Sequence, residues 1–175
     1  PSLPASHPWH LPYTSHTLGS WLRMNRSMLV FLAHHGETVG SHVDPRRPLS
    51  DFGRTQVDSL ANRAAARAVR PEVIWHSGKL RARQTAEAYW RACNPLAEFS
   101  ATRWMQPDDP PVIADQLGVE NRDVLLVGHM PHLERLFRRL IGEMPSVECF
   151  PQNGLVAIER TETDWEERWR LVATR

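Results

Sequence analysis

Short apolar segments alternate along the chain with longer segments in which apolar residues recur every three or four positions. The apolar segments predict strands at 28–33, 73–75, 96–99 and 123–127, followed by two closing strands at 155–159 and 169–173. The amphipathic segments predict helices at 51–69, 80–92, 112–117 and 131–141. Ser50 is suited to cap the first of these helices.

The order of these elements predicts the fold class. Strand followed by helix, repeated, is typical of a mostly parallel central sheet covered by helices on both faces, which is a three-layer α/β/α fold. Ligands bind such sheets at the carboxyl ends of the strands. His35, Ser77 and His129 each lie at or just beyond a predicted strand end. The pattern alone therefore predicts a site where these residues meet.

Residues 1–27 differ from the rest of the chain. They carry four prolines and two tryptophans without helical or strand periodicity. They also lack the continuous apolar core of about 7 to 15 residues that a secretory signal needs. We interpret 1–27 as an N-terminal arm and 28–175 as one domain, long enough for a single core. Met28 opens the first predicted strand and is a candidate start codon, which would make the arm an extension of the gene model.

The composition indicates which kinds of partner and which cellular compartment to expect. Lys and Arg number 21 against 20 Asp and Glu, so the bulk charge indicates neither a nucleic-acid nor a membrane partner. No apolar run approaches the roughly 18 residues of a membrane span. Cys93 and Cys149 are too few for a disulfide framework. A reducing compartment is therefore favoured, and we expect a cytoplasmic protein.

Three segments at predicted strand ends carry residues suited to phosphoryl transfer. Residues 34–38 are His-His-Gly-Glu-Thr, residues 128–129 are Gly-His, and Arg81 lies in the first turn of a predicted helix. A neutral imidazole can attack a phosphoryl group and carry it as phosphohistidine. Arginine and a second histidine can hold the phosphoryl oxygens. We identify His35 as the candidate nucleophile, and His129 and Arg81 as the groups that hold the oxygens.

These segments resemble the motifs of the histidine phosphatase superfamily, which includes the phosphoglycerate mutases. The family's Arg-His-Gly motif, followed by Glu or Gln and Thr, is similar to residues 34–38. Its Ser-Pro, Arg-Ala and Thr motif is similar to residues 77–85, and its strand running into Gly-His is similar to 125–129. Residues 47–56 look like the start of the family's first long helix. The short chain, without a large insertion between the second and third motifs, looks most like the SixA-type phosphohistidine phosphatases.

The resemblance implies a phosphoglycerate mutase-like fold over roughly residues 28–173 and a phosphatase that needs no metal or other cofactor. It also implies a phosphorylated substrate, with a histidine-phosphotransfer protein as a possible partner. His34, Thr38 and Ser77 join Arg81 and His129 as phosphate-binding candidates. Sugar phosphates and nucleotides present the same terminal group, although the short loops favour a protein substrate.

The chain departs from the family pattern at three positions. His34 stands where the family has arginine. Loss of that charged donor would weaken transition-state binding by about 2 to 4 kcal/mol, judging from deletions of oxyanion donors. If cationic His34 replaces the arginine, activity should favour mildly acidic pH, since an ordinary histidine is charged mainly below about pH 6.5. Gly78 replaces a proline and loosens a turn. Ser41 replaces an asparagine of many mutase-like members, which counts against mutase activity.

The proton donor has several candidates. Larger relatives use an acidic residue after the second motif, where Asp108 and Asp109 lie in a Pro-bounded loop. Glu37, beside His35, is an alternative. A solvated turn would account for the aspartate pair equally well.

Two other functions fit the same residues. Without an arginine at position 34, the chain could bind phosphate or phosphohistidine without turnover. The histidines at positions 34, 35, 42, 76, 129 and 132 could instead assemble the site of a metal-dependent hydrolase. Against the metal site, the chain has no His-x-x-x-His helix motif and no Asp-rich strand end.

Overall fold

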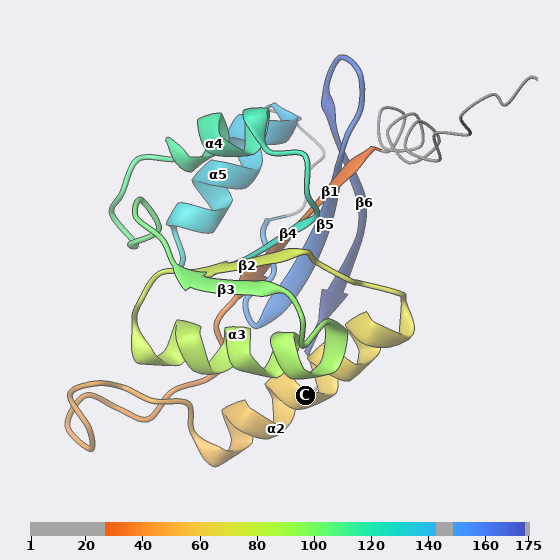
Figure 1. Cartoon of the computed structure of the whole chain (residues 1–175). Coiled ribbons are helices and arrows are strands. Elements are labelled where there is room, and N and C mark those ends of the chain that lie inside the picture. Colours follow the sequence, from red (N-terminus) through yellow and green to blue (C-terminus); the bar gives the residue numbers. More distant parts are fainter. Residues whose placement is uncertain (1–26, 143–148, 174–175) are drawn as a thin grey trace, which may run out of the picture.

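Six strands form one sheet in the order β3-β2-β4-β1-β5-β6 (Figure 1). The computed structural model describes residues 27–142 and 149–173. The strands are β1 (Met28–His34), β2 (Val73–His76), β3 (Glu98–Ala101), β4 (Val124–Gly128), β5 (Gly154–Arg160) and β6 (Trp165–Val172). The first four run parallel, β5 pairs antiparallel with β1, and β6 pairs antiparallel with β5. The prediction of a mostly parallel sheet is confirmed.

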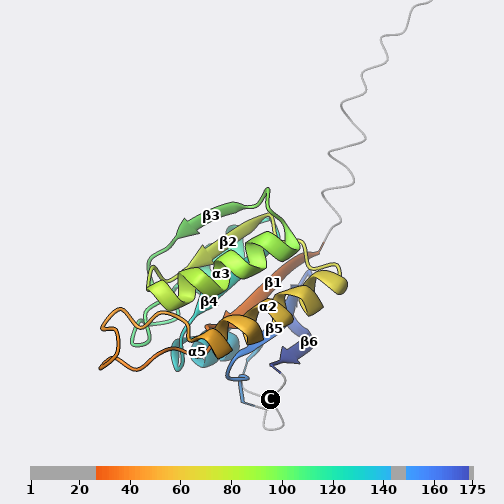
Figure 2. The same ribbon diagram turned by 90° about the horizontal axis from the view of Figure 1, so that it is seen from below.

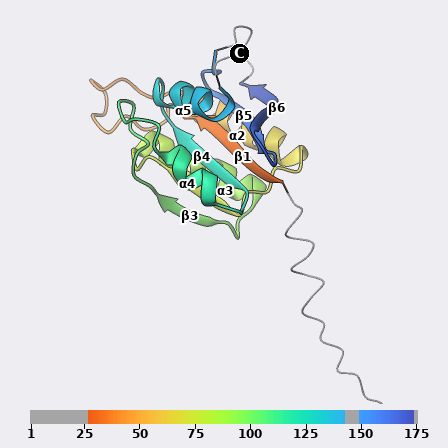
Figure 3. The same ribbon diagram turned by 90° about the horizontal axis from the view of Figure 1, so that it is seen from above.

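Helices cover both faces of this sheet. α2 (Asp51–Ala66) and α3 (Leu80–Cys93) lie on one face, which is seen from below in Figure 2. α4 (Ile113–Val119) and α5 (His132–Ile141) lie on the other, seen from above in Figure 3. The three-layer α/β/α arrangement is therefore also confirmed.

The strands divide their side chains between two hydrophobic cores. Successive side chains of a strand point to opposite faces of the sheet. Accordingly, Phe31 and Ala33 of β1 pack in the core that includes α2 and α3. Val30 and Leu32 pack in the core that includes α4 and α5. Because both faces are buried, the central strands are continuous apolar runs, as expected for a parallel sheet covered by helices.

Most element boundaries differ from the prediction by one or two residues, and three of the differences have a clear description. The helix predicted at 51–69 ends at Ala66, because Ala68 turns into a left-handed conformation with φ 58°. The strand predicted at 96–99 is shifted to Glu98–Ala101. The closing strand predicted from residue 169 already begins at Trp165. Its first half is polar and ion-paired, as in the 3.0 Å contact between Arg168 Nε and Glu159 Oε2.

The start of α2 is as predicted. Ser50 is its N-cap, and the Ser50 hydroxyl oxygen accepts a hydrogen bond from the Gly53 N–H at 2.9 Å. Most of the predicted N-terminal arm lies outside the described residues, so its division from the domain at 27/28 stays a prediction. Among the helices that the structure describes, none has the length and apolar character needed to cross a membrane.

The central strands should dominate stability. Leu126 of β4 is 0% exposed between two helical layers, whereas Leu96 is 94% exposed in the turn before β3. We expect Leu126→Ala to lower the free energy of unfolding by about 2 to 5 kcal/mol, through lost burial and the cavity left behind. Leu96→Ala, the matched control, should change it by less than about 0.5 kcal/mol. Urea denaturation of both variants measures the difference, and equal effects would contradict the described core.

Candidate active site

The carboxyl ends of three parallel strands lie side by side at one edge of the sheet. β1 and β4 are in register with His34 opposite Gly128. Two backbone hydrogen bonds continue past the strand ends. His35 N donates to Gly128 O, and Ser77 N donates to Val127 O, both at 3.3 Å. The segments that the sequence placed at separate strand ends therefore meet.

The His35 ring is held by hydrogen bonds on both nitrogens. Arg81 Nε donates to His35 Nε2 at 3.1 Å, and His35 Nδ1 lies 2.8 Å from Gly36 O. A guanidinium has no acceptor, and a carbonyl has no donor. The neutral ring must then carry its proton on Nδ1 and keep a lone pair on Nε2. Nε2 is therefore the nucleophilic atom of this imidazole.

Thr85 of α3 anchors the backbone next to His35. Gly36 N donates to Thr85 Oγ1 at 3.1 Å, and the Thr85 hydroxyl donates to Arg81 O at 2.9 Å. Thr85 is 1% exposed. Gly36 packs so closely on α2 that an added Cβ would lie 2.5 Å from Val57 Cγ2. Only glycine fits at this position without movement of α2.

His129 and Ser77 form a second pair at the site. Their Nε2 and Oγ atoms lie 2.6 Å apart, and both residues are buried. The rings of His129 and His35 are 5.0 Å apart between centroids. Gln106 helps to hold Ser77 in place, because the Gln106 Nε2 donates a hydrogen bond to Ser77 O at 2.7 Å. Arg81, His35, His129 and Ser77 thus form one cluster.

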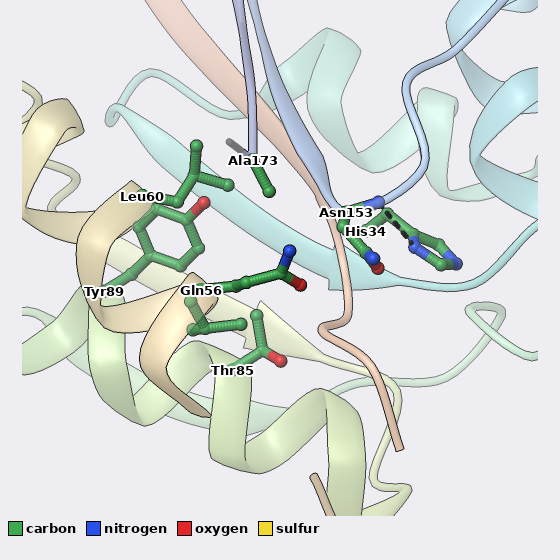
Figure 4. A pocket seen from close by; sticks show the side chains of 8 residues that line it. His34, Gln56, Leu60, Thr85, Tyr89, Asn153 and Ala173 are labelled. Atoms are coloured by element: carbon green, nitrogen blue, oxygen red, sulfur yellow. Dashed lines mark hydrogen bonds between the residues drawn. The ribbon is translucent and has the colours of Figure 1, made fainter. Parts of the chain in front are cut away.

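His34 lies beside His35, with 4.3 Å between ring centroids. Its Nδ1 accepts the backbone N–H of Asn153 at 3.2 Å, the dashed line in Figure 4. The neutral ring therefore carries its proton on Nε2, which makes that atom a hydrogen-bond donor. Burial lowers the pKa of His34 to about 4. The expectation of a cationic His34 at mildly acidic pH is wrong, because in this site the imidazole stays neutral there.

Burial also keeps the other two imidazoles neutral. It is the largest cause that lowers the pKa of His35 to about 3 and that of His129 to about 2. The positive charge of Arg81 lowers both further. A neutral His35 is the form that can attack phosphorus. Positive charge at this edge therefore comes from arginine and lysine rather than from histidine.

Arg47 is a site residue that the sequence analysis missed. Its Nη2 donates to Thr38 Oγ1 at 3.1 Å, and its charge lowers the pKa of both His35 and Arg81. The sequence indicated only that residues 47–56 start a helix. The available signal was the position of Arg47 three residues before Ser50, the cap of the helix that follows β1 in the chain. A second guanidinium thus lies close to the His35–Arg81 pair.

The loop between β3 and α4 carries the predicted proton donors, and one of them, Asp109, has a structural partner. Asp109 Oδ2 accepts the Gln106 N–H at 2.7 Å, and Asp108 is exposed. The Asp109 carbonyl lies 3.1 Å from His132 Nδ1 and 2.9 Å from Arg135 Nη2. These contacts fix the loop to α5. No described hydrogen bond joins either aspartate to His35.

Glu37 also has a structural partner. It is exposed, and its Oε1 accepts the Ser50 hydroxyl at 2.9 Å. Its backbone carbonyl accepts the Ser50 N–H at 3.0 Å. Glu37 therefore fastens the His35 segment to the start of α2.

Gly78 does more than loosen its turn. Its φ is +84°, a value that proline, with φ fixed near −65°, cannot adopt. Gly78 N donates to His76 Nδ1 at 3.0 Å, a bond that proline cannot make. Glycine in place of the family's proline therefore allows the turn after Ser77 a backbone conformation and a hydrogen bond that proline would exclude.

Among the described residues, no three His, Cys, Asp or Glu side chains are grouped so that they could hold a metal ion. The histidines considered above as metal ligands include members of the site, His76 beside Phe99, and His132 at the start of α5. The hypothesis of a metal-dependent hydrolase therefore has no ligand set within the parts of the chain that the structure describes.

Known proteins share this fold, and part of the chain matches a family model. Residues 30–104 match the family model of the histidine phosphatase superfamily (branch 1). A structure from Agrobacterium tumefaciens assigned as the phosphohistidine phosphatase SixA has a TM-score of 0.69 at 27% identity, over 83% of this chain and 98% of that one. The protein histidine phosphatase SixA complexed with tungstate has a TM-score of 0.71 at 25% identity, over 83% and 97% of the two chains.

A more distant structure shares the fold alone. A mycobacterial glucosyl-3-phosphoglycerate phosphatase complexed with VO3 has a TM-score of 0.64 at 15% identity, over 84% of this chain and 100% of that one. No curated protein sequence matches the chain. The structural similarities confirm the expected phosphoglycerate mutase-like fold and, with the family match, support a phosphatase-type function.

The neutral histidines should make stability depend on pH. In the unfolded chain an ordinary histidine takes up a proton near pH 6.5, whereas His34, His35 and His129 in the folded site do so only at about 4, 3 and 2. The unfolded state then binds more protons, so the free energy of unfolding should fall as pH drops from about 7 to about 5.5. His129→Gln should show a smaller fall in urea denaturation. Equal slopes for the two proteins would contradict the neutral assignment of His129.

Proposed function

Because residues 30–104 match the family model of the histidine phosphatase superfamily and two SixA structures are similar to this chain, we propose that it is a metal-independent phosphatase that works through a covalent phosphohistidine on His35. The observation that carries this proposal is the hydrogen bond from Arg81 Nε to His35 Nε2. It supports a neutral imidazole with its lone pair on Nε2, directed at a guanidinium that binds phosphate well.

Through this hydrogen bond Arg81 occupies the lone pair of the nucleophile. When a phosphoryl group enters, its negatively charged oxygens compete for the guanidinium donors, and Nε2 becomes free to attack. Arg81 lies in the first turn of α3, where free backbone N–H groups also favour an anion. One residue thus protects the nucleophile and attracts its target.

The other phosphoryl-binding groups surround this pair. Ser77 and His129 can each supply a hydrogen bond, since their shared contact of 2.6 Å can be exchanged for contacts to phosphate oxygens. Arg47, held on Thr38, adds a second guanidinium. His34 adds a neutral Nε2–H in place of the family's arginine. The site would balance a dianionic phosphoryl group with two arginines rather than three.

The reaction has two displacement steps. His35 Nε2 attacks phosphorus, an Nε2–P bond forms, and the bond from phosphorus to the leaving oxygen or nitrogen breaks with its electron pair on the leaving atom. That atom takes a proton from Asp108 or Asp109, either directly or through a water molecule. A water molecule then attacks phosphorus and gives a proton back to the same carboxylate, and the Nε2–P bond breaks with its electron pair on Nε2. Orthophosphate leaves and neutral His35 is restored.

We propose phosphohistidine on a protein, such as a histidine-phosphotransfer protein, as the substrate, and a cytoplasmic location for the encounter. Of two similar structures, one is described as the phosphohistidine phosphatase SixA and the other as the protein histidine phosphatase SixA. An imidazole also leaves readily once it is protonated, so this substrate places little demand on a proton donor. Such a substrate suits a chain in which two of the three acidic candidates, Asp109 and Glu37, have structural partners.

A phosphate- or phosphohistidine-binding protein without turnover is the second candidate function. The observation that favours it is the neutral state of His34, which leaves the position of the family's arginine uncharged. Binding needs fewer cations than stabilisation of a transition state, so a site with reduced charge could still hold phosphate.

Removal of the nucleophile tests the mechanism. We expect His35→Ala to lower phosphate release from a phosphohistidine protein and from p-nitrophenyl phosphate by at least about a thousandfold, with chelator present throughout. His42→Ala, an exposed histidine of the following loop, is the matched control and should keep wild-type rates. Loss of turnover in chelator would overturn the metal-independent mechanism. Phosphate binding without any wild-type turnover would favour the binding protein.

Restoration of the family's arginine tests the cost of His34. We expect His34→Arg to raise kcat/KM by about 10- to 100-fold, because a charged, bidentate donor replaces a neutral, single one. His34→Gln keeps one neutral donor and should stay close to wild type. Steady-state kinetics on the same two substrates measure both variants. A rate unchanged by arginine would mean that Arg47 already supplies the charge that the reaction needs.

A further inference from the structure

Four hydrogen bonds connect His35, Gly36, Thr85 and Arg81 in a closed ring. Gly36 N donates to Thr85 Oγ1 (3.1 Å), and the Thr85 hydroxyl donates to Arg81 O (2.9 Å). Arg81 Nε donates to His35 Nε2 (3.1 Å), and His35 Nδ1 donates to Gly36 O (2.8 Å). Each residue donates to the next one in the same direction. Two groups of the ring, the Thr85 hydroxyl and the His35 imidazole, both accept and donate, and through each of these groups one bond polarises the next.

The ring determines which tautomer His35 adopts. If the proton moved from Nδ1 to Nε2, the Nε2–H would face the Arg81 Nε–H, and the bare Nδ1 would face the Gly36 carbonyl. Two attractive contacts would become repulsive. The lone pair stays on Nε2 only while Arg81 and the Gly36 carbonyl keep their places around the ring.

Gly36 is the weakest point of this arrangement. It must be glycine, because a Cβ would lie 2.5 Å from Val57 of α2. Glycine leaves the backbone free to rotate, yet its carbonyl has to stay on His35 Nδ1. Thr85 removes this freedom by holding the Gly36 N–H. Thr85 can do so because it is buried and fixed on α3 by its own bond to Arg81 O.

We infer that Thr85 is the positioning residue that fixes the His35 tautomer and the placement of His35 against Arg81. This inference rests on the proposed function of His35 as nucleophile. Thr85 lies on α3 beside Gln56 of α2 (Figure 4), and it acts on the reaction only through Gly36 and Arg81.

Substitution of the hydroxyl tests the inference. Thr85→Val keeps the branched shape and removes both hydrogen bonds, whereas Thr85→Ser keeps the hydroxyl. We expect the valine variant to lower kcat by about thirtyfold or more with KM changed by less than about threefold, because small misplacements of reacting groups are costly. The serine variant should stay within about threefold of wild type. Thr55→Val is the matched control. Thr55 also donates to the carbonyl four residues earlier, that of Asp51, but it is exposed on α2.

The tautomer gives a readout that needs no turnover. Two-bond ¹H–¹⁵N spectra should show His35 of the wild type and of Thr55→Val protonated on Nδ1, and His35 of Thr85→Val as a mixture of tautomers. An unchanged tautomer in folded Thr85→Val would overturn the role of Thr85, whatever the kinetics. Absent turnover in the wild type would instead count against the proposed function. If circular dichroism shows that the valine variant is unfolded, Thr85→Ser and Thr85→Ala, which differ only in the hydroxyl, replace it in both measurements.

Discussion

The hydrogen bond between Arg81 Nε and His35 Nε2 is the constraint on which the site depends. A guanidinium can only donate, so this contact assigns the lone pair of the imidazole before any substrate is present. It exists because β1 and β2 flank β4 in one parallel register, which brings the residue after β1 next to the first turn of the helix after β2. The order of the strands and the chemistry of the site are therefore one feature, since a different strand order would separate the two residues.

In this site the positive charge lies on arginines, whereas the nucleophilic histidine is neutral. Three imidazoles stay neutral because burial opposes their protonation, while Arg81 and Arg47 remain charged because a guanidinium keeps its proton in proteins. A protonated His35 could not attack phosphorus, and a site without cations could not hold phosphate. The division between neutral histidines and charged arginines meets both needs. It also explains why a histidine at position 34 cannot stand in for an arginine, since the burial that keeps its neighbour nucleophilic keeps His34 uncharged.

Much of this could be predicted from the sequence, and the rest failed for identifiable reasons. The apolar runs of β1 and β4 and the cap at Ser50 are local signals, and they predicted their elements correctly. The first half of β6 carries charged residues that pair with β5, such as Arg168 with Glu159, so apolar periodicity could not detect it. The neutral state of His34 depends on burial, and its tautomer depends on Asn153, a contact across 119 residues. Arg47 lies at the site only because of the conformation of the loop that carries it, which no local sequence signal predicts.

The glycine of the His35 segment shows how precision arises in this fold. Close packing of α2 on β1 excludes every side chain at position 36, and the resulting glycine would by itself leave the segment flexible. The rigidity lost there is recovered from the opposite side, where Thr85 of α3 holds the Gly36 N–H. The two helices that cover this face of the sheet thus act differently on Gly36. Packing on α2 determines how close the Gly36 backbone lies to that helix, and the hydrogen bond to Thr85 of α3 determines the orientation of the Gly36 backbone. The geometry of the proposed nucleophile is therefore a consequence of packing in the core, and residues that never touch phosphate help to determine it.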